Sequence, residues 1–140
     1  MKNRTFDLEE RLLEYAALIV HLVDKMDRRA SARHIGNQLL RAGTSPLFNH
    51  GEAQGAESQK DFIHKMGICL KELRESRRAL MLVKKVPLSQ HMEQVEHALE
   101  ETEELIRIFF TSIRTAKVNL TKEEHSTYIT SPLEVERCEL

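Results

Sequence analysis

The residues between positions 60 and 85 could bind phosphate groups, because this segment holds eight Lys or Arg and three Asp or Glu. If it is helical, a turn of 100° per residue places five basic side chains opposite the apolar face. They are Lys60, Lys71, Arg74, Arg78 and Lys85. Six Glu and no Lys or Arg follow within residues 93–104, so the basic face could instead pair with these carboxylates. No aromatic residue alternates with the basic ones, which disfavours stacking on single-stranded bases.

A second polar stretch, RAGTSPLFNHGEAQ at residues 41–54, lies where the helical pattern expects core residues. Asn49 falls on the apolar seam and Glu52 follows one helical turn later, so the carboxylate of Glu52 needs a partner such as Arg41 or an arginine of the next helix. The motif to be explained comprises Arg41, Ser45, Pro46, Asn49 and Glu52. We interpret it as an interhelical polar network that fixes helix register; the alternative is a ligand or nucleic-acid pocket.

The histidines and cysteines do not form a catalytic or metal-binding pattern. His91 and His97 are six residues apart, whereas two ligands on one helix need a spacing of three or four. Cys69 shares the apolar side of its segment, where a thiol stays protonated, and Cys138 has no nearby activating group in the sequence. We therefore predict no catalytic residue, no metal and no cofactor.

Composition limits the fold and location of the chain. Its 140 residues suffice for one domain, and 5 Gly, 3 Pro and 5% aromatic residues favour an all-α fold. The net charge of -1 gives no bulk attraction to nucleic acid. No apolar run reaches the roughly 18 residues that span a bilayer, and two cysteines without metal-ligand spacing suggest a reduced compartment. We expect a soluble cytoplasmic protein.

Apolar residues at steps of three and four predict three helices before Pro87. The first should run from about Leu8 to Met26 with Asp7 as its N-cap. The second should start near Ser31 and continue through Pro46, with a kink there, because the seam Ile35, Leu39, Ala42, Pro46, Asn49 and Ala53 is unbroken. A helix that stops at Gly43 is the alternative. The third should begin after Ser58, with Asp61 completing a capping arrangement, and end near Lys85.

The fourth predicted helix has the most regular pattern. From Leu88 to Leu120 its apolar residues step by four and three with Thr102 as the sole polar member, which is a heptad seam. The rhythm is lost after Thr121, so residues 1–121 are predicted to form an antiparallel up-down-up-down four-helix bundle and residues 122–140 a flexible polar tail.

Three apolar residues of the fourth helix lie off its main seam: Leu105, Ile108 and Phe110. They cannot all face the core of one chain if the seam is the buried face. Several such residues on one long helix suggest a second buried face and therefore self-association.

The segment from Leu39 to Leu80 resembles a known bacterial family of four-helix bundles, named after proteins encoded in intervening sequences of large-subunit ribosomal RNA genes. The matching residues are Arg41, Thr44, Ser45, Pro46, Asn49, Glu52, Ala53, Ser58, Lys60, Asp61, Phe62, Leu70, Glu72 and Leu73. FDLEERLLEYA at residues 6–16 is also similar to the start of that family. The resemblance covers about residues 6–120, and Leu47-Phe48 departs from it where small residues are common.

The resemblance implies an antiparallel bundle that assembles into a ring-shaped homopentamer, with no catalysed reaction. The accessory variability determinant of diversity-generating retroelements, a basic pentamer that works with a reverse transcriptase and nucleic acid, looks like a relative. Two hypotheses follow. One is a pentamer that binds RNA, DNA or a reverse-transcriptase-like protein through its basic face; the other is a scaffold that binds only proteins.

Overall fold

Four helices make up the part of the chain that the structure describes, residues 7–129, in a computed structural model. They are α1 (Leu8–Asp24), α2 (Ala30–Gln54), α3 (Gln59–Lys85) and α4 (Met92–Ile129). The two predicted N-caps are confirmed, because Asp7 accepts a hydrogen bond from the Glu10 amide and Ser58 accepts one from the Asp61 amide. Such caps satisfy backbone donors that have no partner inside the helix. The predicted all-α four-helix fold class is therefore confirmed.

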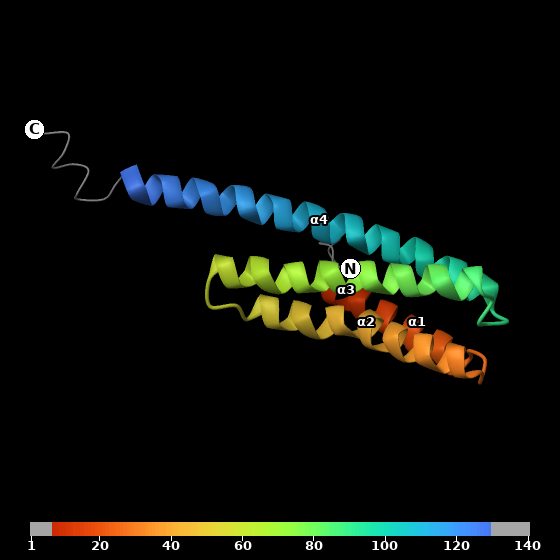
Figure 1. The fold of residues 1–140 in the computed structure, drawn as a ribbon. Helices are drawn as coiled ribbons and strands as arrows, with labels where there is room; N and C mark the ends of the chain where they lie inside the picture. The colour runs from red at the N-terminus through yellow and green to blue at the C-terminus, as the bar shows by residue number, and fades with distance from the viewer. Residues whose placement is uncertain (1–6, 130–140) are drawn as a thin grey trace, which may run out of the picture.

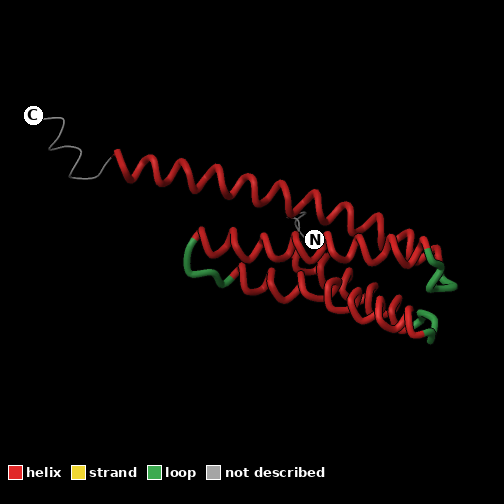
Figure 2. Tube along the Cα trace, in the orientation of Figure 1, coloured by secondary structure: helices red, strands yellow, loops and turns green. Residues whose placement is uncertain are grey.

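The helices pack in sequence order, α1 on α2, α2 on α3 and α3 on α4, and α1 closes the bundle with a smaller contact on α4 (Figure 1). Short loops join the helices, and two of these loops lie together at one end of the molecule (Figure 2). There the Asp27 amide donates to the carbonyl of Leu88 at 3.0 Å. This contact ties the α1–α2 connection to the α3–α4 connection.

Helix α2 continues through Pro46, as predicted, although proline cannot donate to the carbonyl of the preceding turn. The Thr44 hydroxyl donates to the carbonyl of Leu40 at 2.7 Å, and the Asn49 amide donates to the carbonyl of Ser45 at 3.1 Å. These side chains supply additional hydrogen bonds on either side of Pro46. The kink at Pro46 stays a prediction.

Gly43 allows α1 and α2 to approach closely. A Cβ atom at this position would lie 2.7 Å from Cγ2 of Ile19. Because Ile19 is fully buried, it has little room to move away. Gly43 is thus a packing residue inside α2 and not the end of a helix.

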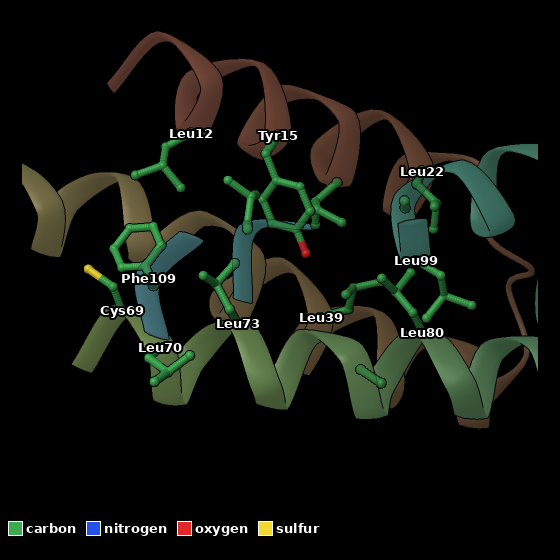
Figure 3. Packing of buried hydrophobic residues seen from close by; sticks show 14 of the residues in the cluster. Leu12, Tyr15, Leu22, Leu39, Cys69, Leu70, Leu73, Leu80, Leu99 and Phe109 are labelled. Carbon is green, nitrogen blue, oxygen red and sulfur yellow. The ribbon is translucent and has the colours of Figure 1, made fainter. Parts of the chain in front are cut away.

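The core draws residues from all four helices and is built mainly from aliphatic side chains (Figure 3). Tyr15 is the largest fully buried side chain. Its hydroxyl points toward the interior, where it lies 2.7 Å from the Thr102 hydroxyl. Since Thr102 donates to the carbonyl of Ala98 at 2.6 Å, the Tyr15 hydroxyl supplies the hydrogen of the Tyr15–Thr102 bond. Burial raises the pKa of Tyr15 to about 12, against the effect of hydrogen bonds with Thr102 and Ser76.

The structure corrects the expectation that Leu105 contacts another subunit. Leu105 is fully buried in the core of the single chain, so it has no surface to offer to another subunit. The reason is that α4 contacts both α3 and α1, which widens its buried face beyond one heptad seam.

The end of α4 also differs from the sequence prediction, which placed it near Leu120. The helix continues to Ile129 and, blue in Figure 1, runs past the α2–α3 connection. Residues 121–127 are exposed, and good helix formers such as Lys122, Glu123 and Glu124 sustain a helix without an apolar face. Residues 130–140 of the predicted tail lie outside the described residues.

The buried polar residue of α2 is His50, where the sequence pattern indicated Asn49. His50 is 5% exposed, while Asn49 is half-buried and bonds to Ser45 within its own helix. His50 follows Pro46 by four residues and precedes Ala53 by three, and both of these are buried, so His50 fits the same helix face as well as Asn49 does. Burial lowers the pKa of His50 from 6.5, and the nearby carboxylates of Glu9 and Asp7 oppose this.

We expect Tyr15→Phe to lower the free energy of unfolding by about 1 kcal/mol, because it removes one buried hydrogen bond while keeping the ring. Urea unfolding followed by circular dichroism measures this. Leu13→Ala, at a residue that is 50% exposed on the same helix, is the control and should change stability less. A Tyr15→Phe variant as stable as the parent would contradict the role assigned to this bond.

We also expect stability to fall as the pH drops below 6.5, the ordinary pKa of histidine. The unfolded chain binds a proton there more readily than the folded chain does, so acidification favours unfolding, by at most about 1.4 kcal/mol per pH unit for one group. Urea unfolding near about pH 7.5 and about pH 5.5 tests this. The difference should shrink in His50→Leu and persist in His64→Leu, whose histidine is exposed.

Candidate nucleic-acid interface

Helix α3 lies between α2 and α4, so its charged side chains divide into those that face each neighbour and those that face outward. Charges beside a neighbouring helix can find partners on it, whereas outward charges meet solvent. The ion pairs of the structure show which basic residues remain available to a phosphate group.

On the side of α2, two sets of ion pairs link the helices. Arg41 reaches both Glu72, at 3.1 Å, and Glu75. Lys65 bonds to Glu52 at 2.9 Å. Since residues early in α2 pair with residues late in α3, the two helices run antiparallel.

The polar motif of α2 is therefore not the single buried network that the sequence suggested. The Glu52 side chain is 59% exposed and its partner is Lys65, not an arginine. Asn49 and Ser45 bond to each other, and Arg41 forms separate pairs with α3. Because exposed ion pairs contribute little to stability, we expect replacement of Glu52 to change the free energy of unfolding only slightly.

On the side of α4, three basic residues of α3 have acidic partners. Lys84 pairs with Glu96 at 2.6 Å, Arg77 with Glu103 at 3.4 Å and Lys60 with Glu124 at 3.4 Å. The alternative of pairing with the glutamates of residues 93–104 is thus present for Lys84 and Arg77. Lys60, a member of the predicted basic face, pairs instead with Glu124, which lies beyond that span.

The other four predicted residues form an outward row. Lys71, Arg74, Arg78 and Lys85 are all exposed, and none forms an ion pair with another residue of the described range 7–129. The spacing of three, four and seven residues keeps them on one side of α3, over about 20 Å at 1.5 Å per residue. We call these four residues the outward basic row.

Two open grooves flank this row. One, of about 640 Å³, lies toward α2 and includes Arg41, Lys71 and Glu72. The other, of about 660 Å³, lies toward α4 and includes Arg77, Glu103 and Arg107. Arg74 and Arg78 border both grooves. A chain of phosphates could therefore lie on either side of these two arginines.

Arg77 and Arg107 are residues that sequence reasoning did not assign to this surface. Arg77 lies next to Arg78 in the chain but turns toward α4, and Arg107 pairs with Glu104 at 2.8 Å. The only signal in the sequence was the spacing of Arg107 three residues after Glu104. Their positions beside the outward basic row depend on the register between α3 and α4, which the sequence does not show.

The described residues support neither a nucleophilic Cys69 nor a metal site. Burial raises the pKa of the Cys69 thiol to about 12, so it is not a nucleophile near neutral pH. Within residues 7–129 no three His, Cys, Asp or Glu side chains could together hold a metal ion. In the same range no helix is long and apolar enough to cross a membrane.

The predicted oligomer contacts of α4 differ in exposure. Phe110 is 50% exposed and has the guanidinium of Arg114 6.0 Å from its ring centre. Ile108 is half-buried, and Leu105 belongs to the core. Phe110 is therefore the residue of this set with the most apolar surface available to a second subunit.

Comparison with known proteins places this fold. The family model described as "23S rRNA-intervening sequence protein" matches residues 5–111. A crystal structure of a protein of unknown function from the S23 ribosomal protein family of Bacteroides thetaiotaomicron VPI-5482 is similar, with 31% identity and a TM-score of 0.70. The match covers 76% of this chain and 97% of that one. No curated protein matches. The four-helix fold and the matched residues together show that this chain belongs to the 23S rRNA-intervening sequence protein family.

Proposed function

We propose that this protein is a non-enzymatic homo-oligomer, a ring of five subunits, that binds the phosphate backbone of RNA or DNA through the outward basic row. The observation that carries the proposal is the division of charge on α3. The basic residues that flank the neighbouring helices are paired, and Lys71, Arg74, Arg78 and Lys85 are exposed without an ion pair to the rest of residues 7–129.

Arginine and lysine bind phosphate oxygens through charge-assisted hydrogen bonds, and each contact also releases a counterion. A residue already paired with a carboxylate must give up that partner first. The four residues of the row pay no such penalty, so they are the cations best placed to bind phosphate.

One subunit offers few phosphate contacts, which alone give weak binding. A ring repeats the row once per subunit, and contacts made together by one long polyanion raise the overall affinity without any new residue. The oligomer is therefore what makes a chain of net charge -1 able to hold nucleic acid. Because the row contacts no base edge in this scheme, binding is independent of sequence.

We expect Arg74→Glu/Arg78→Glu to bind a mixed-sequence RNA at least about tenfold more weakly than the parent at low salt, since two phosphate contacts become repulsive. Parent binding should weaken steeply as salt rises. A mobility-shift titration at two salt concentrations measures both effects.

Arg28→Glu/Arg33→Glu is the matched control, because it changes the net charge equally at exposed residues next to the α1–α2 connection. It should bind RNA nearly as the parent does. Equal losses in the two double variants would mean that net charge, and not the outward basic row, controls binding. A parent that does not shift RNA at low salt would reject nucleic-acid binding.

For the oligomer, we expect a solution mass of about five times 16.2 kDa, measured by light scattering at micromolar concentration. Phe110→Asp should lower this mass while leaving the helical circular dichroism largely unchanged, since it places a charge in an apolar contact. The control is Leu13→Asp, which alters an equally exposed apolar residue on α1. A parent mass near that of one chain would rule out the ring.

A second candidate is a scaffold that binds proteins and not nucleic acid. The ion pairs from α3 to both neighbouring helices favour it, because they show that many charges of this helix serve packing and solvation. This candidate predicts an oligomer with the same solution mass as the proposed ring that binds no RNA at any salt concentration.

A further inference from the structure

The imidazole of His50 contains a buried polar atom that has no partner among residues 7–129. His50 is 5% exposed, and its Nδ1 forms no hydrogen bond with any residue of that range. Burying such a group without a partner is unfavourable. Packing of the bundle explains why the imidazole is buried, because it meets Phe109 edge-on with 6.2 Å between ring centres. Packing does not explain the unpaired nitrogen.

The other ring nitrogen determines what Nδ1 can do. Nε2 of His50 lies 3.2 Å from Nε2 of Gln54, and an amide nitrogen can only donate. The imidazole nitrogen must therefore accept, which leaves the hydrogen of the neutral ring on Nδ1. Burial lowers the pKa of His50 and so favours this neutral form. Nδ1 is then a donor that lacks an acceptor.

An open groove of about 470 Å³ adjoins His50 where the first turn of α1 meets α2, α3 and α4. Its apolar lining comes from Leu8, Phe62, Met66 and Ile108, and its polar lining from Asp7, Glu9, His50, Gln54 and Ser112. Leu8, Phe62 and Ile108 are only half-buried, so apolar surface remains uncovered in the groove. The volume falls within the range of about 300–1,000 Å³ that is typical of small-molecule sites.

We propose that this groove is a binding site for a small, mainly apolar molecule that carries one hydroxyl or carbonyl oxygen, which accepts the hydrogen of His50 Nδ1. Nδ1 is covered in the unliganded chain, so side chains beside it must move aside on binding. The site is separate from the outward basic row.

Charge at the groove limits the ligand further. Asp7 and Glu9 belong to its lining and lie close enough to His50 to act on its pKa. A carboxylate or phosphate would meet the negative charges of these two exposed acids, which disfavours an anionic ligand. The ligand is therefore uncharged, although an anion would offer Nδ1 a stronger acceptor.

Three probes with the same aromatic ring separate the contributions of the hydrogen bond, the apolar contact and the ligand charge. They are benzyl alcohol, toluene and benzoate, each titrated into the full chain. Histidine side-chain ¹H–¹⁵N spectra report His50 directly. We expect benzyl alcohol to shift the His50 nitrogens saturably and to bind about threefold to tenfold more tightly than toluene, the value of one hydrogen bond. Benzoate should bind most weakly.

In His50→Leu the advantage of benzyl alcohol over toluene should disappear, while His64→Leu, at an exposed histidine of α3, should keep it. Circular dichroism checks the fold of both variants, and the parent spectra decide the question if His50→Leu unfolds. Absence of saturable shifts, or equal binding of alcohol and toluene to the parent, overturns the proposal. Binding only after removal of residues 1–6 also overturns it, because the chain itself would then fill the groove.

Discussion

The hydrogen bond between Tyr15 and Thr102 is the constraint on which the alignment of the bundle depends. A phenol hydroxyl in an apolar core must find a partner, and the Thr102 hydroxyl, held by the carbonyl of Ala98, is that partner. Since α1 and α4 contact each other least of the adjacent helices, this bond and the Arg11–Glu101 ion pair at 2.7 Å fix their relative position. A shift of α4 by one turn would separate the Tyr15 hydroxyl from Thr102, which would keep its bond to Ala98 within α4.

That alignment also decides which charges of α3 are neutralised. With α4 fixed, Glu96, Glu103 and Glu124 lie beside Lys84, Arg77 and Lys60, and α2 brings Arg41 beside Glu72. Desolvation raises the pKa of Glu72, against the effect of Arg41, so this pair also holds a charge close to the core. The outward basic row is what remains after both flanks have been paired, which makes it a consequence of helix register.

Much of this fold could be predicted from the sequence because helix signals are local. Asp7, Ser58 and the apolar steps of three and four located the helices, and even the passage of α2 through Pro46 followed from an unbroken seam. The predicted positions of Leu105, Asn49 and Glu52 were wrong because burial depends on how many neighbours a helix has and how it is rotated, and a single seam does not contain that information. The candidate site was predicted only as a set of basic residues; the partners that distinguish Lys60 from Arg74 come from other helices.

The net charge of -1 hides a strong separation of charge. Helix α1 lies diagonally across from α3, and the charged lining of the groove between α1 and α4 is Asp7, Glu10, Glu14 and the paired Arg11 and Glu101. This groove therefore carries more acidic than basic side chains, whereas the outward basic row is cationic, and affinity for phosphate follows the local field and not the sum of charges. If the outward basic row holds a polyanion in a ring of subunits, as we propose, α3 of every subunit must face it and the acidic groove must face away. On that proposal, the distribution of charge sets the orientation of each subunit toward the nucleic acid.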